Sequence, residues 1–274
     1  MLENPSNLKE LLLKIEQNNY TVPANVSPFE LALAMTKNIG STDSILRDDL
    51  IYSTLNTWLT NGVFCEKEII KLLDIIMDEN HLFFNIGEKE SDSVFTRAFS
   101  VLIVASALYY HRKTPIFTED RIAKIKEEVI RYYYFERDLR GYVNIKGWAH
   151  TAAHGADALD ELAQCDTIKK EYLLDILNAI KNKVCINYYT YINEEDERMV
   201  TATVSAINRN LIDNAQIINW IKSFGNITII RIPPEYHILK INIKSFLRSL
   251  YFRLLKEEDK KLLTNAIKEV LSTY

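Results

Sequence analysis

Glycine, proline and cysteine are scarce in this chain. Of its 274 residues, only seven are Gly, six are Pro and three are Cys. So few turn-forming residues argue against an all-β or loop-rich protein. The cysteines, Cys65, Cys165 and Cys185, are odd in number and include no CxxC pair, and they lie in apolar helical contexts where Cys acts as a small hydrophobe. We therefore expect three free thiols and a reducing, cytoplasmic location.

An excess of positive charge, a leader segment and a long apolar run are also missing. The formal net charge is −4, so no global positive field exists to hold a polyanion, which argues against nucleic acid as a partner. The first residues show no basic region followed by an apolar stretch, so we expect no secretory signal. The most apolar segment, 94–110, is interrupted by Arg97 and by small polar residues, and it falls short of the roughly 20 apolar residues that a bilayer span needs. We expect no membrane segment.

Helical periodicity dominates what is present. Apolar residues recur at three- and four-residue spacing in segments bounded by capping residues and breakers, and all six prolines fall in loops or first turns. The strand-like run at 227–232 is interpreted as an extended connection, because no partner strand is evident. The pattern predicts an all-α protein. The predicted helices are 6–17, 28–39, 43–60, 66–79, 94–110, 118–133, 148–164, 168–185, 195–209, 213–222, 238–255 and 257–272.

A rough repeat appears among the helices that carry polar residues. They start near Leu46, Val94, Trp148, Glu197 and Asn242, roughly 45–55 residues apart, which is close to the two-helix units of HEAT and armadillo arrays. Each helix pair needs its neighbours to bury its apolar faces. We predict a single domain, 1–274, of helix pairs stacked as an irregular HEAT/armadillo-like α-solenoid. The alternative is a compact irregular helical bundle.

The segment from Arg140 to Asp157 has the most unusual composition. It reads RGYVNIKGWAHTAAHGAD, and two of its glycines frame a short connection that we expect to enter a helix at Trp148. On that helix His150, His154, Asp157 and Glu161 would be spaced by 4, 3 and 4 residues. This spacing places all four side chains on one stripe of a helix.

Two kinds of chemistry suit the stripe, and a structural interpretation competes with both. His150 and His154 can together ligate a metal ion, with Asp157 as an oxygen ligand. Alternatively, a neutral His beside Asp157 acts as a general base. In the structural interpretation the histidines hydrogen-bond to neighbouring helices. Gly155, which costs about 1 kcal/mol in a helix interior, then marks a close neighbour or ligand.

Polar residues at matching positions of the other repeat helices lead to the functional hypotheses. If these helices line the concave side of a solenoid, their side chains converge there. The first hypothesis is a noncatalytic helical-repeat module that binds a protein or small ligand in a concave groove. The expected groove residues are Arg97, Trp148, His150, His154, Asp157 and Arg198.

The second hypothesis is an enzyme, either a hydrolase or a metal-assisted catalyst, that uses His150, His154 and Asp157. A third and weaker hypothesis is nucleic-acid binding along a modest basic strip in the C-terminal region. The negative net charge of the chain argues against this hypothesis. No cofactor is implied, because the common nucleotide, zincin and hydrolase motifs are missing from the sequence. The basic strip consists of Lys240, Lys244, Arg248 and Arg253.

Several segments together resemble the signatures of a family, domain of unknown function 2785. Trp148, His150, His154 and Asp157 stand in the most distinctive of these segments. The resemblance spans nearly the whole chain and implies a bacterial, α-helical, HEAT-like protein, with no activity or cofactor attached. The segments are LRDDLIYSTL (46–55), SDSVFTRAFS (91–100), RGYVNIKGWAHTAAHGADALDEL (140–162), EEDER (194–198) and KSFLRSLYF (244–252).

Overall fold

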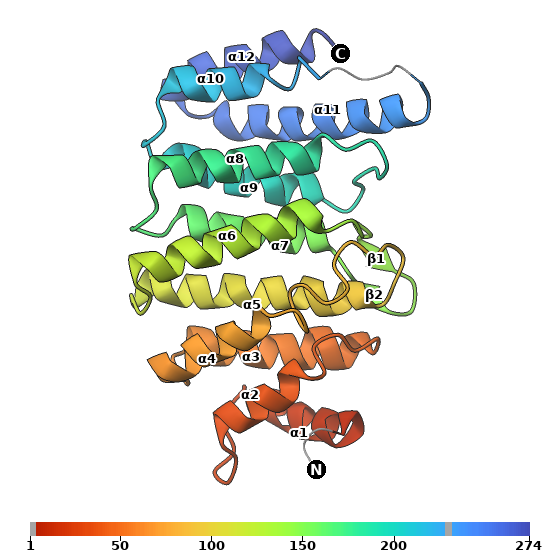
Figure 1. The fold of residues 1–274 in the computed structure, drawn as a ribbon, viewed down its shortest axis with the longest axis vertical. Helices are drawn as coiled ribbons and strands as arrows, with labels where there is room; N and C mark the ends of the chain where they lie inside the picture. Colours follow the sequence, from red (N-terminus) through yellow and green to blue (C-terminus); the bar gives the residue numbers. More distant parts are fainter. Residues whose placement is uncertain (1–3, 228–231) are drawn as a thin grey trace.

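The computed structural model describes residues 4–227 and 232–274, and their regular structure is almost entirely helical (Figure 1). The all-α class is therefore confirmed. The predicted connection at 227–232 lies largely outside the described residues. The elements are α1 (Pro5–Gln17), α2 (Pro28–Thr36), η1 (Ile45–Tyr52), α3 (Ser53–Thr60), α4 (Glu66–Ile76), α5 (Ser93–Lys113), α6 (Glu119–Phe135), β1 (Tyr142–Val143), β2 (Gly147–Trp148), α7 (Thr151–Ala163), α8 (Lys170–Val184), α9 (Glu195–Asn208), α10 (Asn214–Lys222), α11 (Glu235–Leu254), η2 (Glu258–Lys260) and α12 (Lys261–Leu271).

Helix boundaries follow the capping residues within a few positions of the prediction. Asn4 and Ser27 cap α1 and α2 with their side chains, and each is followed by a first-turn proline. Thr118 and Asp213 cap α6 and α10 in the same way. The segment predicted as one helix at 43–60 begins with the wider, π-type turns of η1 and continues as α3.

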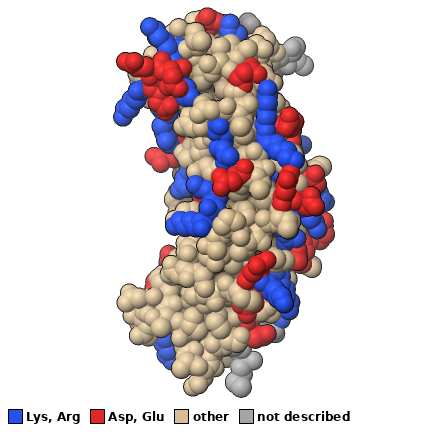
Figure 2. Space-filling model, turned by 90° about the vertical axis from the view of Figure 1, so that its left-hand side faces the viewer, with Lys and Arg blue, Asp and Glu red and all other residues tan. Residues whose placement is uncertain are grey.

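The helices are stacked along the long axis from α1 at one end to α10 and α12 at the other, with α11 between α9 and that last pair (Figure 1). One row consists of α3, α5, α7, α9 and α11, each packed against the next. These are the helices that the repeat spacing singled out. Outside this row, α4, α6 and α8 pack against α5, α7 and α9 respectively. Seen from the side, the outline is curved, and most charged side chains on the visible face lie over the C-terminal part (Figure 2).

A single large hydrophobic cluster runs through the stack from Leu8 to Val270. Helix α5 lies within it and is 21 residues long, so by length and composition it passes as a membrane span, contrary to our expectation that this segment is too short. The helix extends beyond the predicted end at Tyr110 as far as Lys113. However, 83% of its apolar window is buried inside the fold, as in the core helix of a soluble protein.

The helix predicted to start at Trp148 begins instead at Thr151. Trp148 lies in a short antiparallel hairpin, in which Tyr142 pairs with Trp148 in β1 and β2. The backbone takes left-handed conformations at Gly147 (φ 79°) and His150 (φ 54°), which are incompatible with a continuous helix. The prediction of a helix at Trp148 was therefore wrong, and His150 precedes the helical stripe as its N-terminal cap residue.

Candidate functional site

Arg47 anchors the hairpin to η1. Its fully buried guanidinium donates hydrogen bonds to the carbonyls of Ser41 (2.5 Å) and Lys146 (2.7 Å). It also lies over the rings of Phe95 and Phe99, with centroids 4.1 and 4.9 Å away. A side chain at Gly147 would bring a Cβ within 2.7 Å of the Ser44 Cβ, so the hairpin and η1 are in close contact there. Trp148 is thereby held beside η1.

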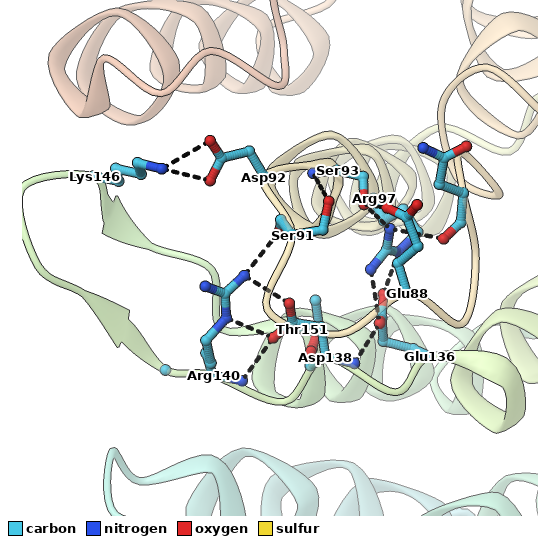
Figure 3. A network of polar contacts seen from close by, with 12 residues as sticks. Glu88, Ser91, Asp92, Ser93, Arg97, Glu136, Asp138, Arg140, Lys146 and Thr151 are labelled. Carbon is cyan, nitrogen blue, oxygen red and sulfur yellow. Dashed lines mark hydrogen bonds and ion pairs between the residues drawn. The ribbon is translucent and has the colours of Figure 1, made fainter.

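A second network connects the hairpin and the start of α7 to the start of α5 (Figure 3). Arg140 donates to the Asp138 carboxylate (2.6 and 2.8 Å) and to the carbonyl of Ser91. Thr151 donates its hydroxyl hydrogen to the carbonyl of Asp138 (2.5 Å). Lys146 bonds both carboxylate oxygens of Asp92 at 2.8 Å. The hairpin is thus tied to α5 and α7.

Arg97 belongs to this supporting network. Its Nε and Nη2 donate to the two carboxylate oxygens of Glu136 at 2.6 and 3.0 Å, and both side chains are buried (Figure 3). Its Nη1 donates to the Ser93 hydroxyl and to the carbonyl of Phe84. The structure therefore places Arg97 inside the fold, apart from the other expected groove residues.

Four consecutive layers of the stack surround a cavity of about 620 Å³. Its walls include Tyr52 from η1, Phe99 and Leu102 from α5, and Trp148 from the hairpin. The fourth side is the connection to α9, where Ile192 is 77% exposed at the cavity edge. Aromatic and aliphatic side chains are five of the eleven described lining residues, and the other six are polar or charged.

His150 and His154 lie side by side in this cavity, with ring centroids 5.7 Å apart. The Nε2 of His150 is 2.9 Å from the carbonyl of Asn193, and the Nδ1 of His154 is 3.2 Å from the carbonyl of Ala98. Since a carbonyl only accepts hydrogen bonds, these nitrogens carry the protons. The other nitrogens, Nδ1 of His150 and Nε2 of His154, are therefore acceptors in the neutral rings. Trp148 stacks on His150 at 4.8 Å.

Burial sets the protonation states of the titratable side chains in the cavity. Burial, and after it the neighbouring His150, lowers the pKa of His154 to about 3. Burial also lowers the pKa of His150, against the hydrogen bond to Asn193. For Asp48, burial raises the pKa to about 6, although Arg47, with Nε 2.7 Å from Oδ1, opposes the shift. Both imidazoles are neutral at pH 7, while Asp48 is mostly ionised.

Asp157 faces Arg198 and does not complete a set with the histidines. The Nη1 of Arg198 lies 2.9 and 3.0 Å from the two carboxylate oxygens of Asp157. Within residues 4–227 and 232–274, no three His, Cys, Asp or Glu side chains are grouped so that they could hold a metal ion. The arrangement predicted for a metal site is thus not assembled.

Next to the first cavity lies a second one of about 410 Å³, and the two share Tyr52 and Leu102 as lining residues. Asp157, Asp160 and Glu161 of α7 line the second cavity, together with amide and hydroxyl side chains of α3 and α5. The two cavities lie along the same row of helices.

The structure places five of the six expected groove residues at the two cavities. Four of the six expected residues, Trp148, His150, His154 and Arg198, line the first cavity, and Asp157 lines the second. The aromatic residues Tyr52 and Phe99 were missed, because helical spacing does not separate a cavity wall from a core. Also missed were Ile192 and Asn193 of the connection to α9, which is held by contacts that no local pattern indicates. The buried Asn242 accepts from the Tyr191 amide and donates to the Tyr189 carbonyl.

The fold and the cavities define an all-α protein of stacked helices with a recess along one helix row. The model of the family "Protein of unknown function (DUF2785)" matches residues 82–252, and the chain belongs to this family. The matched segment contains the hairpin and both histidines, whereas Asp48 and Tyr52 precede it. Searches of the curated proteins and of the solved structures found no match.

Proposed function

We propose that this protein is a noncatalytic helical-repeat module that binds a small organic ligand in the cavity between η1, α5, α7 and the start of α9. The volume of about 620 Å³ lies in the ordinary range for small-molecule sites. Aromatic walls with a few fixed polar groups are the usual composition of such sites. The chain would act as a single domain, a HEAT/armadillo-like solenoid, which the helix row and the continuous core support.

The observation that carries this proposal is the pair of histidines with fixed tautomers. Each ring donates one N–H to a backbone carbonyl, and each keeps one unprotonated nitrogen. Neutral imidazoles held in this way can accept hydrogen bonds from a ligand. They carry no charge, and their rings need not reorient when the ligand binds. A cytoplasmic location in a bacterium fits the three free thiols and the family resemblance.

A second candidate function, hydrolysis, is favoured by one observation only. Asp48 has a pKa of about 6, near the value that suits a general base at neutral pH. The set His150, His154 and Asp157 supports catalysis less well. Asp157 is bound by Arg198, and a pKa of about 3 makes His154 a weak base.

A ligand-observed NMR screen of a library of small organic molecules tests the binding function. We expect compounds that bind the wild-type protein to bind Trp148→Ala at least tenfold more weakly. Leu102→Trp, which fills the cavity, should abolish binding. The control is Phe252→Ala on α11, which removes an aromatic side chain that is 66% exposed and lines neither cavity.

Two outcomes would contradict the proposal. Either no compound binds, or the binders are indifferent to Trp148→Ala and Leu102→Trp. A compound converted to product by the wild type and not by Asp48→Asn would establish the hydrolytic alternative instead.

A further inference from the structure

The first cavity offers acceptors and little positive charge. The unprotonated nitrogens of both histidines and the Asp48 carboxylate are acceptors. Arg198 is the one Lys or Arg among the described residues that line this cavity, and both Asp157 oxygens already bind it. Hence an anionic ligand finds no unpaired cation here.

A buried carboxylate, that of Glu195, also lies near His150, and its Oε2 accepts the N–H of Asn193. Glu195 is fully buried, and its Oε1 has no hydrogen-bond partner among the described residues. That oxygen is 3.9 Å from the Nε2 of His150. Because a buried carboxylate is weakly screened, it adds a negative potential to the cavity.

The second cavity continues this pattern. Among the described residues, no Lys, Arg or His lines it, while three carboxylates of α7 do. Asp157 is paired with Arg198, and Glu161 with Arg112 (2.5 Å). In the part of the chain that the structure describes, Asp160 has no ion pair of its own, and its Oδ1 is buried without a hydrogen-bond partner. Burial raises the pKa of Asp160, although Ser205, Arg112 and Gln164 oppose the shift.

The two cavities are neighbours with complementary walls. Tyr52 and Leu102 line both, so a ligand that occupied both cavities would lie against these two side chains, between the aromatic wall at Trp148 and the carboxylate of Asp160. Such a ligand needs an apolar part for the first cavity and a cation with N–H donors for the second. A protonated amine meets the second requirement, because it supplies both the charge and the donors.

We propose that the ligand is an elongated organic amine, with its apolar part against Trp148 and Phe99 and its ammonium group beside Asp160. This inference rests on the proposed binding function and adds the ligand class. A carboxylate or phosphate in place of the ammonium would face Asp160, which has no ion pair among the described residues, and like charges in a partly buried site repel.

Calorimetric titration with three compounds that share one skeleton tests the ligand class. The probes are 4-phenylbutylamine, 4-phenylbutanol and 4-phenylbutyrate. We expect the amine to bind at least tenfold more tightly than the alcohol, and the carboxylate more weakly than both. Asp160→Asn should weaken the amine about tenfold and leave the alcohol unchanged, since only the amine uses the charge.

Two further variants complete the design. Asp74→Asn removes a carboxylate on α4, paired with Arg121 and lining neither cavity, and should leave all three affinities unchanged. Thr60→Lys introduces an ammonium group into the second cavity, where Thr60 is a lining residue. It should abolish the preference for the amine even if Asp160→Asn folds poorly.

The outcomes separate the two proposals. If the alcohol or the carboxylate binds as tightly as the amine, and Trp148→Ala abolishes that binding, the amine class is wrong while the binding function stands. The amine class is also wrong if Thr60→Lys leaves the preference intact. If neither these probes nor the screened library binds, the binding function itself fails.

Discussion

At the scale of single residues, the buried arginines decide the shape of the site. Arg47 and Arg97 are among the largest fully buried side chains, and each is surrounded by acceptors. From the sequence, Arg97 was expected in a groove because it lies in a polar position of a repeat helix. Its partner Glu136 is 39 positions away, and no local pattern indicates such a pairing.

Replacing Arg97 by Met should strongly destabilise the fold. The substitution leaves Glu136 as a buried charge without its partner, a loss of about 3–5 kcal/mol. Urea unfolding of the variant and the wild type measures the difference. The control is Arg131→Met, because Arg131 is half-exposed and pairs with the exposed Glu79, so its loss should amount to about 1 kcal/mol or less. A near-neutral effect of Arg97→Met would return Arg97 to the groove hypothesis.

His154 should make stability depend on pH in a defined direction. Its pKa of about 3 in the fold lies below the ordinary value, so the unfolded chain binds more protons at intermediate pH. The contribution of the neutral His154 ring to the free energy of unfolding is complete above about pH 6.5. It is lost progressively as the pH falls towards 3. Asp48, whose pKa is raised in the fold, changes the stability in the opposite direction. Its contribution to the free energy of unfolding is lost as the pH rises towards 6.

The variant His154→Gln isolates this effect, because Asp48 titrates in both proteins. Between pH 7 and pH 5 the wild type should lose about 2 kcal/mol more than the variant. Unfolding curves at the two pH values provide the test. Parallel losses in both proteins would mean that His154 titrates normally and is not buried as a neutral ring.

At the scale of elements, helices were predictable and the hairpin was not. Each helix carries its own periodic pattern, and several carry a side-chain cap, so local residues suffice to predict them. The β1–β2 hairpin has two residues in each strand and is held mainly from outside. Its contact from Arg47 to the Lys146 carbonyl spans 99 positions. For this reason the histidine pair was predicted while the backbone that presents it was not.

Gly147→Ala should lower the free energy of unfolding by more than the conformational penalty of a left-handed alanine alone. Gly147 has a left-handed φ of 79°, and an added Cβ would also meet Ser44. We expect a loss of roughly 2–4 kcal/mol from the two effects together. Gly87→Ala is the matched control, since Gly87 has φ 94° with open space around it, and it should lose about 1–2 kcal/mol.

The fluorescence of Trp148 provides the second measurement for these variants. Trp58 and Trp220 are buried, whereas Trp148 is 39% exposed, so iodide quenching reports mainly on Trp148. Gly147→Ala should change the quenching, and Gly87→Ala should not. Equal quenching in both variants would contradict the close contact between the hairpin and η1.

At the scale of the whole molecule, the stack protects two of its three thiols. Cys65 is exposed, Cys165 is buried and Cys185 is partly buried, and all three are free, as the sequence predicted. Burial raises the pKa of both Cys165 and Cys185 to about 12. One thiol should therefore react quickly with Ellman's reagent in the native protein, and three in denaturant. Fewer than three equivalents in denaturant would reveal a disulfide.

The row of helices also has a consequence for how the protein is made. The principal contacts of each helix are with helices within three places of it along the chain. Such local contacts form early, and a stack of this kind grows from neighbour to neighbour. During synthesis, the N-terminal layers can therefore assemble while the C-terminal ones are still in the ribosome. The last wall of the cavity arrives with residues 192–198, so a nascent chain acquires its recess only after four layers are in place.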